Sequence, residues 1–251
     1  MNALAAEGVI SAFLIFCRIG GCLMLMPGVG GRHLSPQFRL FLAIGLSLAF
    51  VPMLQPGVEG FVRGASAFTL LGAIGSETAT GAMIGLLARI FFLALQSMAS
   101  AIAQSIGLAS MAGTMIEDDE MLPPIATLFA FSAMTLLFVS DQHLELVRAL
   151  FDSYRRLPPG TVFTARLGLT DVVDQLTAAF LLALRIASPF IIYSIIVNFA
   201  VGITNKFTPQ LPVYFIATPF ITAGGMLLLY AIMDQLLAGF MMAFGQWLAA
   251  G

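Results

Sequence analysis

The sequence predicts an all-α polytopic integral membrane protein with about six to eight helices and no β-sheet. Its 251 residues are 59% hydrophobic and only 10% charged, with a mean hydropathy of +0.98. Soluble domains carry roughly 25% charged residues, so this chain has too few charges to cover a water-facing surface. The alternation with a period of two that marks β-sandwiches and barrels is absent from the sequence.

The helices are expected in six apolar stretches. These stretches cover residues 9–26, 38–54, 67–110, 122–139, 176–203 and 212–249. A single span needs about 20 residues, so the third and sixth stretches are too long for one span each. Glu7 and Arg18 do not fit the charge pattern of a cleaved signal peptide, and the first helix is therefore expected to remain in the mature protein.

Prolines and small polar residues predict where several helices begin and end. Pro27 is expected to end the first helix, and Ser35-Pro36 to start the second with a serine N-cap and a proline in the first turn. Pro52 and Pro56 are expected to end the second helix. Pro123-Pro124 is expected to restart a helix after the central loop.

Residues 140–172 form the one stretch with the composition of a soluble segment. Within it, residues 143–156 have the pattern of a short amphipathic helix lying in the membrane interface. Residues 157–160, Leu-Pro-Pro-Gly, predict a turn.

The membrane orientation stays open. The positive-inside rule places the loop that carries Arg32 and Arg39 in the cytoplasm. Six simple spans counted from there put Arg155 and Arg156 outside, against the same rule. Either a long segment is a hairpin, or the helices do not span the bilayer in the conventional way.

Five charged residues lie inside apolar stretches: Arg18, Glu77, Arg89, Arg185 and Asp234. A charge at the centre of a span costs about 2.5–3.5 kcal/mol on insertion scales, and such residues normally face a protein interior or an aqueous cavity. We expect Arg18, Arg185 and Asp234 to be buried. Snorkelling from a helix end is the alternative for Glu77 and Asp234.

Glu77, Gly81, Gly85 and Arg89 follow one another at intervals of four residues. On a helix they form one ridge, and two glycines spaced in this way let another backbone approach closely. The spacing therefore predicts a helix-contact ridge.

The central loop, residues 104–124, is polar and rich in small residues, with methionines at 111, 115 and 121. Residues 117–120 are four consecutive carboxylates, which have no reason to cross lipid. Irregular backbone at membrane depth survives only inside protein or around water, so the loop is interpreted as held within an assembly of helices. A solvated loop between helices is the alternative.

Residues for catalysis or metal binding are not apparent. His33 and His143 lack metal-ligand spacing, and the acidic run lacks the alternating pattern of a calcium loop. No phosphate-binding or dinucleotide motif and no nucleophile elbow occurs. The chain is interpreted as a non-enzyme without a cofactor, and the net charge of −2 does not indicate nucleic-acid binding.

Over nearly its whole length the sequence resembles the FliR family, the export-gate subunit of the flagellar type III secretion apparatus. The residues that carry the resemblance are, in order, Arg18, Pro27, Pro36, Arg39, Glu77, Gly81, Gly85, Gln104, Gly107, His143, Leu157, Pro158, Gly160, Pro189, Asn198, Gly202, Asn205, Lys206, Pro209, Gln210, Leu211 and Pro219. The C-terminal part of this set, with Asn198, Gly202, Pro209, Gln210 and Pro219, is the most specific.

The resemblance implies a subunit that forms, with FliP and FliQ, the pore for unfolded flagellar substrates, with FlhB and FlhA as further partners. It implies a location in the bacterial cytoplasmic (inner) membrane, within the flagellar basal body. It also implies a FliP-like helical part over residues 1–180 and a FliQ-like helical hairpin over residues 181–251.

The family's plug falls here on residues 106–122. The plug residues implied are Gly107, Met111, Gly113, Met115, Ile116 and Met121. We expect residues 107–116 at the constriction and the carboxylates towards water. Small and thioether side chains would then form a deformable seal.

Two other functions stay open at this point. The paralogous injectisome subunit, the SctT family, has the same architecture. A stand-alone small-molecule transporter is the alternative from another class, although such proteins often show an internal repeat and none is convincing here. An intramembrane enzyme ranks third, since the catalytic residues are missing.

Overall fold

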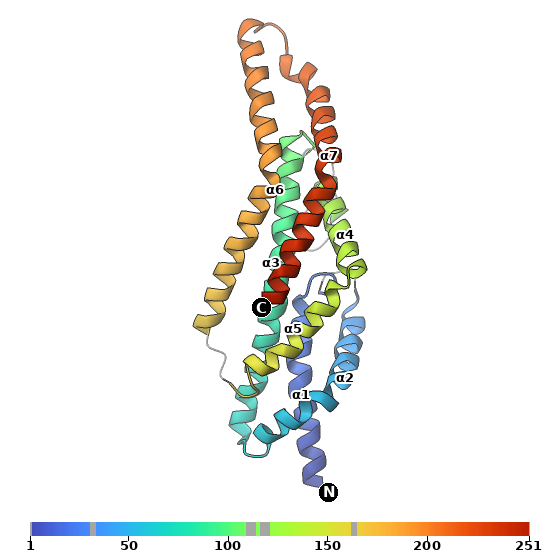
Figure 1. Ribbon diagram of the computed structural model, residues 1–251, viewed down its shortest axis with the longest axis vertical. Coiled ribbons are helices and arrows are strands. Elements are labelled where there is room, and N and C mark those ends of the chain that lie inside the picture. The colour runs from blue at the N-terminus through green and yellow to red at the C-terminus, as the bar shows by residue number, and fades with distance from the viewer. Residues whose placement is uncertain (1, 31–33, 109–113, 116–120, 162–164, 251) are drawn as a thin grey trace. The chain divides into compact units, whose positions relative to one another are not determined.

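The computed structural model describes residues 2–30, 34–108, 114–115, 121–161 and 165–250. In this part of the chain there are seven helices and one very short pair of strands (Figure 1). The helices are α1 (Asn2–Leu25), α2 (Pro36–Val62), α3 (Ala67–Ser105), α4 (Pro124–Val139), α5 (Gln142–Arg156), α6 (Ala165–Phe207) and α7 (Val213–Ala250). The all-α prediction is confirmed.

Five of the described helices are long and apolar enough to cross a membrane, and the number becomes six if α4 and α5 count together as one broken span. Three helices are far longer than the roughly 20 residues that one span needs: α3 with 39 residues, α6 with 43 and α7 with 38. The prediction of a polytopic membrane protein is confirmed.

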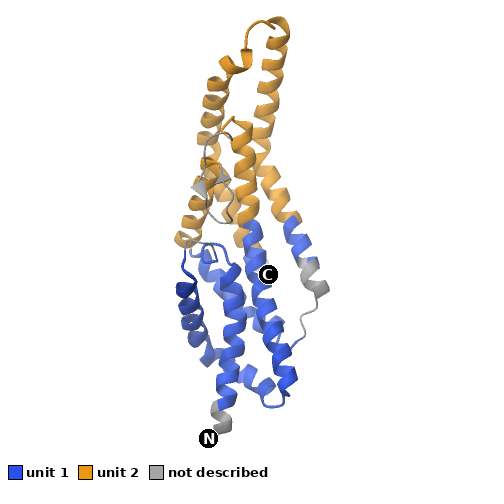
Figure 2. Ribbon diagram, turned by 180° about the vertical axis from the view of Figure 1, so that it is seen from behind, with its two compact units in different colours: residues 1–91, 141–176, 248–251 blue, residues 92–140, 177–247 orange. Residues whose placement is uncertain are grey.

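The chain divides into two compact units (Figure 2). The first contains residues 1–91, 141–176 and 248–251, and so holds α1, α2, α5 and the first part of α3. The second contains residues 92–140 and 177–247, and so holds α4, the end of α3 and most of the α6–α7 hairpin.

Local residues set several helix ends as expected. The Ser35 hydroxyl accepts a hydrogen bond from the Phe38 backbone N–H at 3.3 Å, with Pro36 at the first helical position of α2. Pro27 follows the end of α1, and α4 begins at Pro124. Residues 158–161 form a turn in which the Thr161 N–H donates to the Pro158 carbonyl at 3.2 Å and Gly160 has φ +80°, as a type II turn requires.

The predicted end of α2 is wrong. Pro52 and Pro56 lie inside this helix, which continues to Val62. Each proline removes one backbone donor, but membrane helices tolerate prolines better than soluble ones do because neighbouring groups satisfy the freed carbonyls. The spacing of four residues also places both prolines on one side of the helix.

The prediction that no β-sheet occurs needs one small correction. The two strands β1 (Thr114–Met115) and β2 (Met121–Leu122) pair in antiparallel fashion inside the central loop. Thr114 lies opposite Leu122, and Met115 lies opposite Met121. Two residues per strand are too few for the periodic pattern by which sequence predicts strands.

Each unit has its own apolar core. In the first, α1 packs along α2 and buries Leu14, Ile15 and Ile19. In the second, Phe92 of α3 meets Phe240 and Phe244 of α7 edge to face, at centroid distances of 5.5 and 5.6 Å. Such aromatic pairs add about 0.5–1.5 kcal/mol beyond the area they bury.

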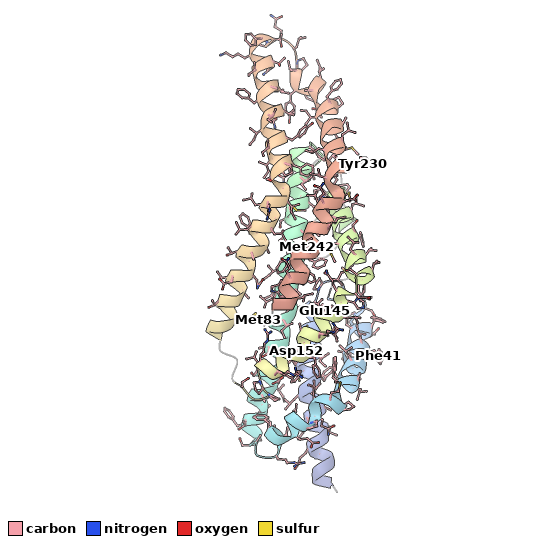
Figure 3. The ribbon with its side chains drawn as sticks, viewed as in Figure 1. Phe41, Met83, Glu145, Asp152, Tyr230 and Met242 are labelled. Carbon is pink, nitrogen blue, oxygen red and sulfur yellow. The ribbon has the colours of Figure 1, made fainter. Side chains whose placement is uncertain are left out.

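Large apolar side chains also cover the outside of the chain. Figure 3 shows Phe41, Tyr230 and Met242 projecting from their helices, and Tyr230 is 87% exposed. A surface of this kind is unfavourable in water and is expected where lipid or other apolar chains surround the protein.

Candidate functional site

Three glycines bring α1 and α3 into close contact within the first unit. A Cβ atom at Gly81 would collide with the Arg18 carbonyl, and one at Gly85 with the Cys22 carbonyl. From the opposite side, a Cβ at Gly21 would lie 2.6 Å from the Thr78 carbonyl oxygen. The structure thus places the glycines of the ridge against the α1 backbone, where any larger residue would separate the two helices.

The first residue of the ridge, Glu77, forms a buried ion pair with Arg18 across this contact. Arg18 Nε donates to Glu77 Oε2 at 2.6 Å, and an Arg18 terminal nitrogen donates to Glu77 Oε1 at 3.0 Å. The two side chains are 1% and 2% exposed. The fork-like pairing matches guanidinium to carboxylate geometry and is the strong form of a charge-assisted hydrogen bond.

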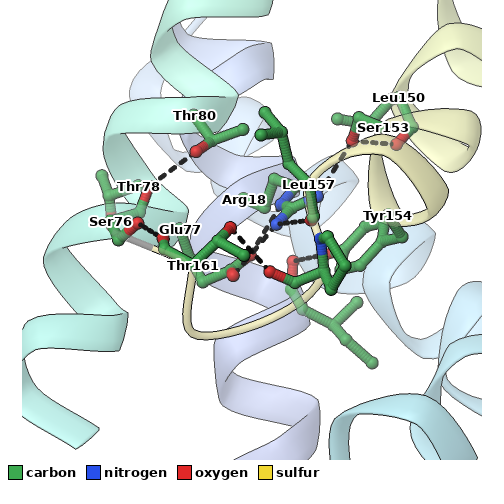
Figure 4. A network of polar contacts seen from close by, with 12 residues as sticks. Arg18, Ser76, Glu77, Thr78, Thr80, Leu150, Ser153, Tyr154, Leu157 and Thr161 are labelled. Carbon is green, nitrogen blue, oxygen red and sulfur yellow. Dashed lines mark hydrogen bonds and ion pairs between the residues drawn. The ribbon is translucent and has the colours of Figure 1, made fainter. Parts of the chain in front are cut away.

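Arg18 also holds the end of α5 (Figure 4). It donates to the Ser153 hydroxyl at 3.1 Å and to the Leu157 carbonyl at 2.9 Å. Its guanidinium carbon lies 3.9 Å from the centroid of the Tyr154 ring, a cation–π arrangement. A cation at a helix C-terminus satisfies free carbonyls and interacts favourably with the helix dipole. One side chain therefore joins α1, α3 and α5.

The turn that follows α5 is held in place by contacts with α3 and α2. The Ser76 hydroxyl, next to Glu77, donates to the Thr161 carbonyl at 2.6 Å. A Cβ at Gly160 would collide with the ring of Phe61, so this position requires glycine both for space and for its positive φ. We refer to Arg18, Glu77, Ser153, Tyr154 and Leu157 as the arginine joint.

The arginine joint has the properties of a structural element. Both charges are neutralised by each other, and the Ser153 hydroxyl in turn donates to the Leu150 carbonyl at 2.6 Å. Among the described residues, no group of three or more His, Cys, Asp or Glu side chains is placed to hold a metal ion. What this arrangement can do is fix the mutual positions of three helices.

The central loop begins with a well-defined helix end. Gly107 has φ +79°, the Leu108 N–H donates to the Ala103 carbonyl at 2.8 Å, and the Gly107 N–H donates to the Gln104 carbonyl at 3.2 Å. This pair of bonds is a Schellman motif with glycine at the position that favours it. Gly107, predicted as part of the plug, thus caps α3.

Of the other predicted plug residues, Met115 and Met121 pair through β1 and β2. Met111, Gly113 and Ile116 lie outside the described residues. Between the two strands lie residues 116–120, the segment with the four carboxylates, which are also outside the described residues.

The base of the loop rests on α7 within the second unit. A Cβ at Gly225 would collide with the side chain of Ile106, which is fully buried. A Cβ at Gly107 would lie 3.3 Å from the Thr222 hydroxyl. On the other side of α7, the Tyr193 hydroxyl of α6 donates to the Ile221 carbonyl at 2.8 Å and occupies the space above Gly224.

The other predicted charges are less buried than Arg18 and Glu77. Arg18 is buried as expected, but the side chains of Arg185 and Asp234 are exposed in the single chain, because no other described helix covers those faces of α6 and α7. Arg89, the last residue of the ridge, is half-buried.

The residues of the C-terminal resemblance are distributed along the α6–α7 hairpin. The Asn198 amide donates to the Ser194 carbonyl at 2.8 Å, and a Cβ at Gly202 would meet open space. Pro209 and Gln210 lie in the connection between α6 and α7, and Pro219 lies inside α7. Pro27 lies in the turn after α1.

Sequence reasoning gave no role to Tyr154 and Tyr193, and it did not predict the contacts that Ser153 and Ile106 make. Their types are ordinary for an apolar protein, so no local pattern distinguishes them. The adjacent glycines 224 and 225 are the one available signal, because such a pair inside a helix often marks a close approach.

Comparison with known proteins places these features in context. The family model described as "Bacterial export proteins, family 1" matches residues 9–247. The chain is 29% identical to the flagellar biosynthetic protein FliR of Caulobacter vibrioides over 91% of both chains. It is 28% identical to FliR of Aquifex aeolicus, covering 89% of this chain and 85% of that one. It is also 28% identical to the Yop proteins translocation protein T of Yersinia pestis, covering 90% and 86%.

Proposed function

Because the chain belongs to the bacterial export proteins, family 1, we propose that it is the FliR-type subunit of a flagellar protein export gate in the bacterial inner membrane. The match over residues 9–247 is the observation that carries this proposal, since it covers all seven described helices at least in large part. Membership in a type III export apparatus follows from the same match and from the FliR relatives.

In this proposal the chain forms a pore with FliP and FliQ, and contacts FlhB and FlhA. Residues 1–180 act as a FliP-like part, and residues 181–251 as a FliQ-like hairpin. The exposed apolar side chains of α6 and α7, such as Tyr230 and Met242, support burial against lipid and other subunits. Arg185 and Asp234 make no ion pair within the described part of the chain, so partner chains would neutralise them.

Purification of the tagged chain from membranes, followed by mass spectrometry, tests this assignment. FliP- and FliQ-like chains are expected to stay bound in a stable complex, while an untagged strain supplies the background. Recovery of a clean monomer would contradict the proposal and favour a stand-alone transporter.

We further propose that the central loop closes the pore at rest. The pairing of Met115 with Met121 supports this role, because it brings the backbones of two methionines together, and methionine is an adaptable residue that suits a seal which must yield to substrates. Deletion of residues 110–117 is expected to raise ion leak through the assembled complex in vesicles. A normal leak in a correctly assembled deletion variant would refute this role.

A second candidate is the injectisome subunit of the same architecture. The similarity to the Yersinia translocation protein, 28% identity over 90% of this chain, equals that to the Aquifex FliR. Rescue of motility in a strain lacking its own FliR would favour the flagellar function. Rescue of an injectisome mutant alone would favour the other.

A further inference from the structure

Charged residues are rare in the second unit and lie at only two levels of the α6–α7 hairpin. Among the residues of this unit that the structure describes, only Arg185, Lys206 and Asp234 are charged. Lys206 lies in the last turn of α6, next to the connection with α7, and follows Arg185 by 21 residues. At 1.5 Å per residue, the two cations are about 32 Å apart along the helix. This separation matches the roughly 30 Å thickness of the hydrocarbon core of a bilayer.

Asp234 of α7 lies near the level of Arg185. Tyr193 of α6 contacts Ile221 and Gly224 of α7, which fixes the register of the two antiparallel helices. Arg185 precedes Tyr193 by eight residues, and Asp234 follows Gly224 by ten. The two charges are therefore within about one helical turn of the same level. Between this level and the connection of the hairpin, both helices are free of charged residues.

No other part of α6 offers a charge-free segment of this length. Only ten residues separate Asp174 from Arg185, about half of what one span needs. The twenty residues 186–205 carry no charge. A bilayer placed nearer to the start of α6 would enclose both Arg185 and Asp234 in hydrocarbon, which disfavours ionised side chains.

Polar groups between the two levels form hydrogen bonds within the hairpin. The Asn198 amide donates to the carbonyl and the hydroxyl of Ser194 at 2.8 and 3.1 Å. Pro189 cannot donate to the Arg185 carbonyl, and the Ser188 hydroxyl donates to that carbonyl instead, at 2.8 Å. Hydrocarbon supplies no hydrogen-bond partner, so internal pairing of this kind is what a lipid-facing helix requires.

The exposed side chains between the two levels also suit lipid. Ile192, Ile195, Ile196 and Phe199 project from α6 without cover. The two exposed tyrosines of α7 lie near the two ends of the segment, Tyr214 beside the connection and Tyr230 one turn before Asp234 (Figure 3). Tyrosine is enriched at membrane interfaces because its ring is apolar and its hydroxyl is polar.

We propose that residues 186–205 of α6 and 214–233 of α7, together named the hairpin span, face the hydrocarbon core of the bilayer. Arg185 and Lys206 then extend their charged ends into opposite headgroup layers. At the headgroup level, Arg185 and Asp234 meet water and lipid on one side and partner chains on the other. The part of α6 that precedes Arg185 lies outside the hydrocarbon, which accounts for the excess length of this helix.

The depth of a spin label in the membrane tests this proposal. Single cysteines carry a nitroxide in the assembled complex, which is reconstituted in phospholipid vesicles. Oxygen concentrates in hydrocarbon, whereas a polar nickel complex stays in water, so the ratio of their collision rates reports depth. The ratio is expected to be highest at Ile195→Cys and Ile196→Cys, midway between the cations, and to fall towards Lys206→Cys. The parent complex, treated with the same label, supplies the background.

Phe180→Cys is the matched control for Phe199→Cys. Both positions hold exposed phenylalanines of α6, with 63% and 69% of the residue exposed, but only Phe199 lies in the hairpin span. Collisions with nickel are expected at Phe180→Cys and are expected to be lost at Phe199→Cys. Equal nickel collisions at the two positions would overturn the proposed boundary at Arg185.

Two other results would also overturn the proposal. Protection of Ile195→Cys and Phe199→Cys from both reagents would show that another protein chain covers the hairpin span. Access of nickel to both positions would place the segment in water. If Ile195→Cys does not assemble, Ile196→Cys reports nearly the same depth. The measurement does not depend on whether the complex is flagellar or belongs to an injectisome.

Discussion

Replacement of Glu77 by glutamine tests the arginine joint most directly. Glutamine keeps the size of the side chain and one acceptor oxygen, but it turns an amide N–H₂ towards the Arg18 guanidinium, where Glu77 Oε1 and Oε2 now accept bonds of 3.0 and 2.6 Å. The charge of Arg18 then stays buried without a counterion. Removal of one partner from a buried pair typically costs about 3–5 kcal/mol.

The expected effect can be expressed as a melting temperature. For a chain of this size, each kcal/mol shifts the midpoint by about 2–4 °C, so Glu77→Gln should lower it by about 6–20 °C. Thermal unfolding of the purified complex in detergent, followed by circular dichroism, measures the shift.

Glu145→Gln is the matched control. It removes the same charge from the ion pair with Arg148, whose side chain is 71% exposed while that of Glu145 is 48% exposed. An exposed pair contributes about 0–1 kcal/mol, so the midpoint should move by no more than a few degrees. Equal shifts for Glu77→Gln and Glu145→Gln would refute the reasoning.

The charge-swapped double variant, Arg18→Glu with Glu77→Arg, tests whether the ion pair between α1 and α3 is sufficient or whether the contacts of Arg18 with α5 are also needed. It restores opposite charges but places a carboxylate near the Leu157 carbonyl and the face of the Tyr154 ring, both of which now contact a cation. We therefore expect no rescue. Recovery to the wild-type melting temperature would show that pairing between α1 and α3 is all that matters.

Three further predictions concern single positions. Gly85→Ala should destabilise the chain by about 2 kcal/mol or more, because its methyl group collides with the Cys22 carbonyl. Gly75→Ala has open space for its methyl group and should stabilise α3 by about 0.5–1 kcal/mol. Thermal unfolding of both variants measures the two effects. Ser35→Ala removes the α2 N-cap and should cost about 1 kcal/mol by the same measurement, and an unchanged midpoint would exclude a stabilising cap. Gly160→Ala introduces strain at φ +80° together with a collision with Phe61, so it should increase proteolytic cleavage between α5 and α6, and wild-type resistance would contradict this.

The sequence predicted best what neighbouring residues determine. The N-cap at Ser35, the start of α4 at Pro124 and the turn at Gly160 each depend on a few adjacent residues whose chemistry is specific. The predicted end of α2 at Pro52 and Pro56 was wrong because the rule that proline ends a helix is derived from soluble proteins. In those proteins, water solvates both the freed carbonyls and the ends of a broken helix.

Contacts between distant residues were beyond such rules. Arg18 and Glu77 were each identified as a charge in an apolar stretch. No sequence pattern predicts that these two residues, 59 positions apart, form an ion pair. Ile106 and Gly225 carry no charge at all, and their contact depends on where α3 ends against α7. Arg185 and Asp234 were expected to be buried, but one chain alone does not bury them.

The arginine joint also imposes an order on the making of this protein. Ser153 follows Arg18 by 135 residues, which a ribosome adds in roughly 7–27 s at typical rates. For all of that interval α1 is present and its guanidinium lacks the hydroxyl and carbonyl acceptors of α5. Until Glu77 is synthesised, a newly inserted α1 therefore carries a charge that lipid disfavours by about 2.5–3.5 kcal/mol. This cost favours retention of α1 beside the insertion machinery until α3 is inserted.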